Sequence, residues 1–254
     1  MCNDAPVAVP NSTDPYYDKV MHVTFVRRET VAAATETFWF QPERRVRYSA
    51  GQFTELYLEH EGADGRGLRR WFTLSSSPTE PLVAVTTTFA GNKGSTFKKA
   101  LRALPPGGQL QLADPLGDFV LPKDPSIPLV FIAAGAGITP MRSMVKYLLD
   151  TKERRSIHLI YAVTHAEDLA FIPLFKEYGL RLTVIVKQPA ANYNGETGSI
   201  TPDRILQLAG DDSASYLYFS GPEPMVEAFY KDFTARGISA DRLVTDYFPG
   251  YTTF

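Results

Sequence analysis

The segment LRRWFTLSSSP, residues 68–78, places cationic, aromatic and hydroxyl side chains on one short stretch. Its composition predicts a strand, on which alternate residues share a face. Arg70 and Phe72 are then expected on one face, and Arg69, Trp71 and Thr73 on the other. An arginine can bind a diphosphate through two nitrogens, an aromatic ring can stack on a heteroaromatic ring, and hydroxyls can bond to the ring edge. Taken alone, the segment still favours the plainer interpretation, an edge strand with solvated arginines.

Two further segments combine a strand with a glycine turn and a helix, FIAAGAGITPM and YLYFSGPEPM. In the first, Gly135 and Gly137 allow a tight turn, and we interpret Thr139 as the N-cap and Pro140 as the first helical residue. A helix that begins there would direct its N-terminus at a phosphate or another anion. Pro140 stands where a strict GxGxxG fingerprint has its third glycine, so the first turn alone is equally typical of an ordinary tight turn, and the second turn alone favours an ordinary strand-to-helix loop.

The second turn, Ser220-Gly221-Pro222, follows another apolar strand. The carboxyl ends of strands in an open parallel sheet line one crevice. We therefore expect the Ser220 turn and the Gly135 turn to face one another.

The elements that would position these residues fall into two groups. Residues 21–123 contain short β-branched and aromatic runs broken by turn residues, with one helical pattern at 94–104, which predicts an antiparallel β-sandwich or small barrel. From residue 124 onward, continuously apolar strands alternate with helices, which predicts an α/β doubly wound parallel sheet. The predicted domains are 21–123 and 124–254, after a flexible lead-in at 1–20.

Composition narrows the classes of function. A length of 254 residues with 44% hydrophobic content fits two domains, and a net charge of −2 argues against nucleic acid or an anionic membrane as partner. Cys2 is the single cysteine, which excludes an internal disulfide and a cysteine-ligated iron–sulfur cluster within this sequence. No apolar run reaches the roughly 18 residues of a membrane span, and the first twenty residues lack the order of a signal peptide, so we expect a cytoplasmic protein.

Other catalytic chemistries find little support. The sequence has four histidines but no Gly-x-Ser-x-Gly elbow, which argues against a serine hydrolase. His158 and His165 lie seven residues apart without a metal-binding motif, so we predict no metal site. Redox chemistry in this chain would need a bound organic cofactor.

Taken together and in this order, the segments resemble the ferredoxin–NADP reductase superfamily of flavoproteins. The resemblance extends from about Met21 to Tyr251. RWFT is similar to the family's Arg-x-Tyr-Ser/Thr flavin motif, GNKGSTF to its Gly-x-x-Ser stretch, and DPLGDF to its Gly-Pro-x-Gly-x-Phe turn. AAGAGITPM is similar to the nicotinamide-side loop, and SGPEPM to Cys-Gly-Pro-x-x-Met.

The resemblance implies an enzyme that transfers a hydride from NADH or NADPH to FAD and passes the electrons to a separate acceptor, which is a ferredoxin or flavodoxin type of protein or a small molecule. Arg70 would hold the FAD diphosphate, Phe72 would stack on the ring and Thr73 would bond near its N5 atom. The catalytic residues it implies are Thr73, Ser220 and Asp246. The cofactor-binding residues it implies are Arg70, Trp71, Phe72, Thr73, Thr86, Thr88, Gly94, Ser95, Thr96, Gly135, Gly137, Ile138, Thr139, Pro140, Ser220, Gly221, Pro222, Met225, Tyr247 and Phe248.

Some points depart from the family or stay open. Phe72 replaces the family's tyrosine and Ser220 its cysteine, and these losses support a second interpretation, an electron-relay or regulatory subunit without turnover of its own. Spacing leaves open which C-terminal aromatic covers the flavin; the candidates are Tyr247, Phe248, Tyr251 and Phe254. The acids at residues 167–168, after the second strand of the parallel sheet, favour NADH, whereas Lys187 and Tyr193 after the third fit a 2′-phosphate.

Overall fold

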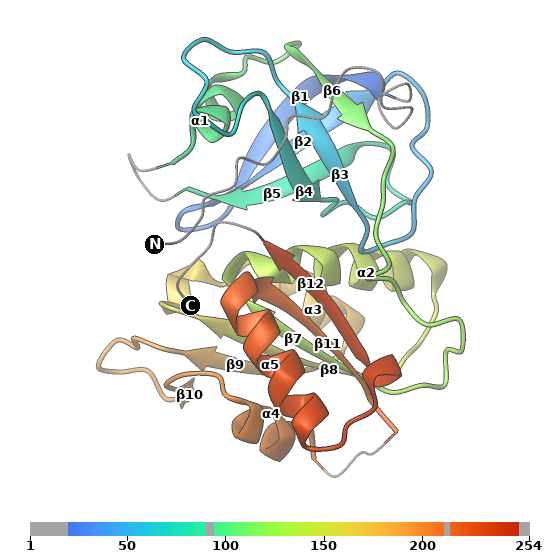
Figure 1. The fold of residues 1–254 in the computed structure, drawn as a ribbon, viewed down its shortest axis with the longest axis vertical. Coiled ribbons are helices and arrows are strands. Elements are labelled where there is room, and N and C mark those ends of the chain that lie inside the picture. Colours follow the sequence, from blue (N-terminus) through green and yellow to red (C-terminus); the bar gives the residue numbers. More distant parts are fainter. Residues whose placement is uncertain (1–19, 90–93, 211–213, 249–254) are drawn as a thin grey trace.

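The computed structural model of the chain describes residues 20–89, 94–210 and 214–248. Two domains lie one above the other in Figure 1, with helix α2 (Ile138–Thr151) between the upper sheet and the lower one. No helix within the described ranges combines the length and apolar character that a membrane crossing needs.

The first domain is an antiparallel sheet that closes on itself. Its strands are β1 (Val20–Ala32), β2 (Thr35–Pro42), β3 (Phe53–Tyr57), β4 (Arg69–Thr73), β5 (Val83–Thr88) and β6 (Gln109–Ala113). Their order is β4-β3-β6-β1-β2-β5, and an antiparallel bridge between Leu74 and Val85 links the two outer strands. The predicted small barrel is therefore confirmed.

Helix α1 (Thr96–Ala103) covers one opening of this barrel. Ser95 is its N-cap and accepts a hydrogen bond from the backbone N–H of Lys98. Phe97 and Leu101 lie one turn apart and are fully buried in the barrel core. The helix predicted from residues 94–104 is therefore present, with the GST sequence at its start.

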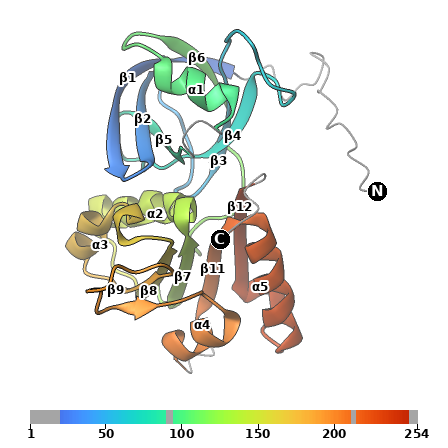
Figure 2. The same ribbon diagram turned by 90° about the vertical axis from the view of Figure 1, so that its left-hand side faces the viewer.

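The second domain is a parallel sheet covered on both faces. Its elements are β7 (Leu129–Ala134), α2, β8 (Ile157–Val163), α3 (Ile172–Tyr178), β9 (Arg181–Val186), β10 (Glu196–Thr197), α4 (Pro202–Ala209), β11 (Tyr216–Pro222), α5 (Glu223–Ala235) and β12 (Leu243–Phe248), with short 3₁₀ turns at Gly135–Gly137, Ala166–Asp168 and Ala240–Arg242. The strand order is β10-β9-β8-β7-β11-β12. Helices α2 and α3 pack on one face, and α4 and α5 on the other (Figure 2). This is the predicted doubly wound sheet.

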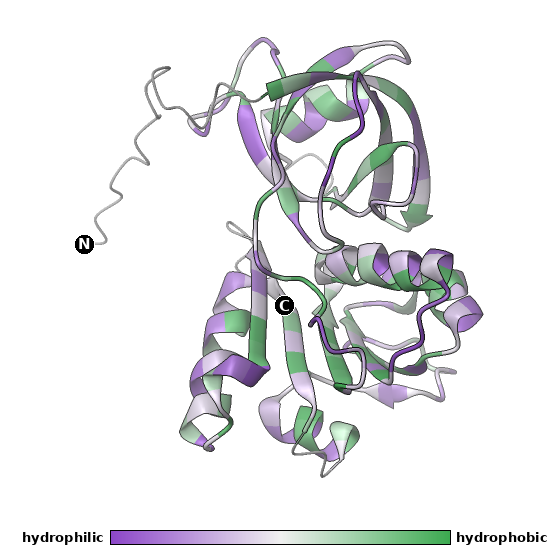
Figure 3. Ribbon diagram, turned by 90° about the vertical axis from the view of Figure 1, so that its right-hand side faces the viewer, coloured by the Kyte–Doolittle hydropathy of each residue, from purple (hydrophilic) through white to green (hydrophobic). Residues whose placement is uncertain are grey.

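Hydropathy explains this layering. The strands β7 and β11 are apolar on both faces, and residues of β7 are at most 7% exposed. Helices α2 and α5 alternate hydrophilic and hydrophobic residues along their length, as Figure 3 shows, because one side of each covers the sheet.

Two details differ from the sequence predictions. Helix α2 begins at Ile138 with Gly137 as its N-cap, so Thr139 is not the cap; its hydroxyl donates instead to the carbonyl of Ala136, at 2.9 Å. Strands β10 and β12 were not predicted. Strand β12, LVTDYF, was missed because Thr245 and Asp246 interrupt its apolar pattern. Within the described ranges it pairs with β11 alone, at the sheet edge.

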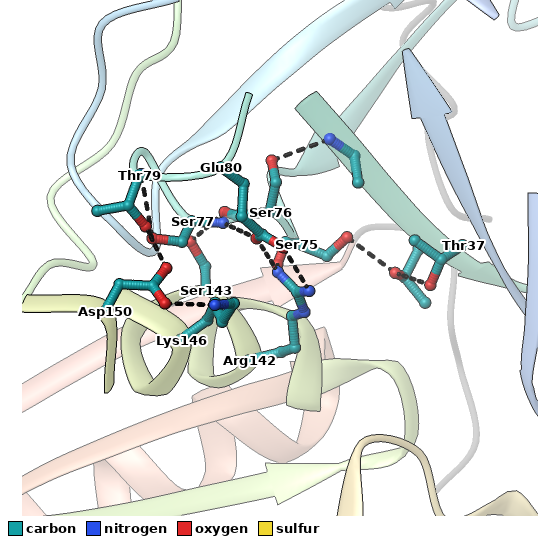
Figure 4. A network of polar contacts seen from close by, with 12 residues as sticks. Thr37, Ser75, Ser76, Ser77, Thr79, Glu80, Arg142, Ser143, Lys146 and Asp150 are labelled. Atoms are coloured by element: carbon teal, nitrogen blue, oxygen red, sulfur yellow. Dashed lines mark hydrogen bonds and ion pairs between the residues drawn. The ribbon is translucent and has the colours of Figure 1, made fainter. Parts of the chain in front are cut away.

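The loop that follows β4 joins the two domains. Ser75, Ser76 and Ser77 are fully buried there. Arg142 on α2 donates to the carbonyl of Ser75 at 2.9 Å and forms an ion pair with Glu80 (Figure 4). The serine run therefore holds the barrel on α2, a role that its sequence did not indicate.

Three more contacts complete this network in Figure 4. Ser143 donates to the carbonyl of Ser76 at 2.5 Å, and Thr79 donates to Asp150 at 2.5 Å. Lys146 pairs with the same carboxylate. Because these contacts connect the loop after β4 to α2, they fix where residues 68–78 lie relative to the glycine turn at the start of α2.

Candidate active site

The two glycine turns meet at the carboxyl ends of β7 and β11. These strands pair directly, with Ala133 opposite Ser220. A Cβ added to Gly137 would lie 2.0 Å from the carbonyl oxygen of Ser220, so only glycine permits this approach. Gly135 has φ +52°, in the left-handed region that favours glycine. The expectation that the turns face one another is confirmed.

A cavity of about 220 Å³ opens beside these turns. The strand order reverses here, since β7 leads to β8 on one side while β11 and β12 lie on the other, and such a switch point is where ligands bind to open parallel sheets. Residues of the predicted set that line it are Thr86, Thr88, Gly135, Gly137, Ile138, Thr139, Gly221 and Pro222. The N-terminus of α2 lies at its wall, which suits an anion.

Two predicted residues serve packing instead. Pro140 is buried in the first turn of α2. Met225 is fully buried, and its Cε atom would lie 2.7 Å from a Cβ added to Gly221. Its side chain therefore packs against the second glycine turn. Neither lines the cavity as a predicted cofactor contact would, because both side chains pack within the second domain.

The barrel contributes hydroxyl groups to the same cavity. The side chains of Thr35 and Thr88 bond across β2 and β5 at 3.0 Å, and those of Thr37 and Thr86 at 2.8 Å. Thr86 also donates to Ser75 at 2.8 Å. Sequence reasoning missed Thr35, which lines the cavity; the pairing of TET in β2 with TTT in β5 was the available signal.

The three predicted catalytic residues come together at the domain junction. Thr73, at the end of β4, donates to the carboxylate of Asp246 at 3.4 Å, and Ser220, at the end of β11, donates to the same oxygen at 3.3 Å. Thr73 is 4% exposed, Ser220 is fully buried, and Asp246 in β12 is partly buried.

The environment of Asp246 favours its protonated form. Burial raises the pKa of this carboxyl to about 7, although hydrogen bonds from Ser220 and Thr73 oppose the change. A carboxyl that titrates near neutral pH, between two hydroxyls from two domains, can hold or release a proton there.

The aromatic residues of β4 lie as the alternation predicted, but with a different consequence. Phe72 packs in the barrel core, 5.8 Å from Phe97 between ring centroids, and is 8% exposed. It therefore offers no free ring face for the expected stacking. Trp71, on the opposite face, is 46% exposed and makes an edge contact with Phe53 at 5.4 Å, so the exposed ring of this strand is Trp71.

Of the C-terminal aromatics, Tyr247 is 48% exposed at the end of β12. The backbone of Phe248 pairs with Pro222, and its side chain lies outside the described part of the chain. Tyr251 and Phe254 also lie outside the described residues.

Arg70 and the start of α1, both predicted at the FAD diphosphate, converge on one point. The carboxylate of Asp64 accepts from Arg70 at 2.7 Å through one oxygen, and from the backbone N–H of Thr96 at 3.2 Å through the other. Arg70 also donates to the carbonyls of Arg66 and Gly67. Its Nε atom is buried and has no hydrogen-bond partner among the described residues.

Gly94 and Ser95 lead directly into this point, since Ser95 caps α1. The convergence was predicted, whereas the part played by Asp64 was not. Its loop, EGADGRG, contains glycines and charges typical of any surface turn.

Comparison with known proteins finds one matching family model and a set of similar reductases. Residues 131–231 match the family model described as oxidoreductase NAD-binding domain. The chain is 25% identical over 212 residues to the reductase component of propane 2-monooxygenase from Rhodococcus jostii, covering 79% of this chain and 55% of that protein. It is 27% identical to the reductase subunit of stachydrine N-demethylase from Rhizobium meliloti, covering 89% of this chain and 67% of that one. It thus spans between about half and two thirds of these relatives' length.

Solved structures share the two-domain fold. A cytochrome P450 reductase from Amycolatopsis superposes with a TM-score of 0.78 at 23% identity, over 91% of this chain and 70% of that one. A ferredoxin NADP⁺ reductase from Neisseria gonorrhoeae, with bound FAD and NADP, gives a TM-score of 0.71 at 19% identity, over 90% of this chain and 98% of that one. The closed antiparallel barrel followed by a parallel sheet is thus the fold of these reductases, and residues 131–231 match an oxidoreductase NAD-binding domain.

Proposed function

We propose that this protein is an FAD-dependent NAD(P)H oxidoreductase that passes electrons to a separate acceptor. The observation that carries the proposal is the meeting of Thr73, Ser220 and Asp246 at the junction of the two domains. Thr73 comes from strand β4 of the barrel, and Ser220 and Asp246 come from strands β11 and β12 of the parallel sheet. The two cofactors must meet between these two domains.

The nucleotide half of the site fits a pyridine nucleotide. The cavity combines a helix N-terminus at Ile138, a close-packed glycine turn, and threonine hydroxyls from the barrel. A helix N-terminus suits the diphosphate, and hydroxyl and backbone groups suit a ribose.

The flavin half also offers suitable groups. Arg70 provides a largely buried cation whose Nε atom has no acceptor within the described chain. Trp71 and Tyr247 provide exposed aromatic rings. Bound FAD would accept a hydride from the nicotinamide and release electrons to the acceptor.

The chain's own residues would orient the reacting groups and manage one proton. Thr73 and Ser220 hold Asp246 by two hydrogen bonds. Because burial raises the pKa of Asp246 to about 7, this carboxyl can take up or release a proton near neutral pH, while the hydroxyls of Thr73 and Ser220 donate hydrogen bonds to its ionised form. Ser220 has no exposed surface, which keeps water from this point.

A protein acceptor is supported by the relatives. Several are the reductase or electron transfer parts of oxygenase systems, such as the electron transfer component of toluate 1,2-dioxygenase from Pseudomonas putida. Because Cys2 cannot form an iron–sulfur cluster alone, we propose that electrons leave this chain for a separate protein or a small acceptor. We also propose a cytoplasmic location.

NADH is the proposed electron donor. Both Asp168 and Lys187 line the cavity, and the Asp168 carboxylate accepts a hydrogen bond from the backbone N–H of His165. A carboxylate there can bind a ribose hydroxyl and repel a 2′-phosphate. We expect a higher kcat/KM with NADH than with NADPH. Asp168→Ser should lower the ratio of the two kcat/KM values, NADH over NADPH, at least fivefold. An unchanged ratio would refute a role of Asp168 in this preference.

The test of the function begins with colour. We expect purified protein to be yellow, or to become yellow with added FAD, and to be bleached anaerobically by NADH. Arg70→Ala should lose FAD, whereas full retention would refute the diphosphate assignment. Protein that never binds FAD would refute the proposal as a whole.

The same experiment separates the second candidate. An electron-relay or regulatory subunit would bind FAD yet stay oxidised under excess NADH and NADPH. The observation that favours this second candidate is the presence of Ser220 in place of the family's cysteine.

A further inference from the structure

We infer that Asp64 is a built-in competitor for the diphosphate of FAD and thereby sets the flavin affinity of this chain. The inference rests on the proposed function, because it takes Arg70 and the start of α1 as the diphosphate site. It concerns the one acidic side chain that both of these groups already bind.

The geometry carries the inference. A diphosphate at this point would need donors from Arg70 and from the first turn of α1. Asp64 takes both, with one carboxylate oxygen 2.7 Å from Arg70 and the other 3.2 Å from the backbone nitrogen of Thr96. Its own backbone N–H donates to the hydroxyl of Thr96 at 3.0 Å, so the loop and the helix are bonded in both directions.

The charges point the same way. Arg66 and Arg70 are the cations that contact Asp64, so the carboxylate lowers the local charge from about +2 to about +1. Burial alone would raise the pKa of Asp64, but hydrogen bonds from Arg66 and Thr96 and the charge of Arg70 outweigh it and hold the pKa below its usual range. The carboxyl is therefore ionised at neutral pH, and its charge opposes the binding of a second anion.

The loop can release the carboxylate. Gly62 and Gly67 flank Asp64 with φ of +64° and +69°, and neither has a neighbouring atom within 4 Å of an added Cβ. Asp64 itself is 26% exposed in its side chain. FAD can thus displace it by movement of this surface loop while β4 and α1 stay in place.

The test compares two flavins on two variants. Dissociation constants are measured by flavin fluorescence quenching on protein stripped of bound flavin, with FAD and with riboflavin, which has no phosphate. Asp64→Asn keeps the shape and an acceptor for Thr96 but removes the charge. We expect it to bind FAD about tenfold more tightly at low salt, with riboflavin unchanged within about twofold.

The matched control is Glu61→Gln, an exposed acid of the same loop, which should leave both constants unchanged. Asp64→Ala repeats the test if thermal melting shows that the Asn variant folds poorly. Unchanged or weaker FAD binding in the variants, with wild-type protein binding FAD, would overturn the role of Asp64. Failure of wild type and variants alike to bind either flavin would instead overturn the proposed function.

Discussion

Substitution of Gly137 by alanine tests the close approach of the two glycine turns. The added Cβ would lie 2.0 Å from the oxygen and 2.4 Å from the carbon of the Ser220 carbonyl, and 2.8 Å from the nitrogen of Gly221. All three are backbone atoms, which cannot rotate away as a side chain can. The end of β11 must therefore move by about 1 Å, against its pairing with β7.

The expected cost follows from this overlap. Overpacking of a core position usually costs about 1–3 kcal/mol, and a backbone obstacle places this one at the upper end, so we expect a loss of about 3 kcal/mol in the free energy of unfolding. For a chain of this size that corresponds to a fall in Tm of roughly 6–12 °C. Urea denaturation measures the first quantity, and the KM for NADH should rise because Gly137 also lines the cavity.

Gly135→Ala is the matched control. Gly135 has φ +52°, with no atom within 4 Å of an added Cβ, so alanine there meets strain without collision and should cost about 1 kcal/mol. Gly137 has φ −59°, which any residue adopts, so its cost is steric alone. A Gly137→Ala protein within about 0.5 kcal/mol of wild type would refute the reasoning.

Other predictions concern the buried charges. Burial raises the pKa of Asp246 from 3.8 to about 7, so the folded wild type loses stability as the pH rises through this window. The Asp246→Asn variant should therefore gain in free energy of unfolding, relative to wild type, between pH 4 and pH 8. Urea titration at each pH measures this difference. An equal difference at both pH values would contradict the shift. Arg142→Met should lower the free energy of unfolding by about 3 kcal/mol, because it leaves the nearly buried Glu80 without its ion-pair partner. Lys146→Met breaks the more exposed pair with Asp150 and should lower it by about 0.5 kcal/mol.

The fold was predictable where one pattern decides the structure. The continuous apolar run LVFIAA is typical of a strand covered on both faces, and the alternation around β4 predicted which residues share a face. Strand β12 was less predictable, because its place depends on β11 beside it and its own residues include Thr245 and Asp246.

The site was predictable where residues follow strand ends. Ser220 lies near the end of β11 and Gly137 follows the end of the neighbouring strand β7, so topology brings them together. Position along a strand does not decide exposure, however. Phe72 was assigned to the flavin because of its motif, but it lies over Phe97 of α1, and the packing of that helix on the barrel places its ring in the core.

Neighbouring residues of the segment 68–78 have different surroundings in the structure. Arg70 is bonded by the loop before it, Trp71 lies exposed on the outer face, and Thr73 reaches the second domain through Asp246. Of the serines after it, Ser75 and Ser76 hydrogen-bond to residues of α2 and β5.

Local spacing could predict which faces these side chains take, since that depends on the strand alone. The groups they meet belong to elements far along the chain, and the competing acid Asp64 belongs to a loop without a motif. A resemblance identifies the residues able to contact a flavin. The free energy with which these residues bind a flavin also depends on how many of their hydrogen-bonding groups are already bonded within the chain. For Arg70, most of the guanidinium donors are.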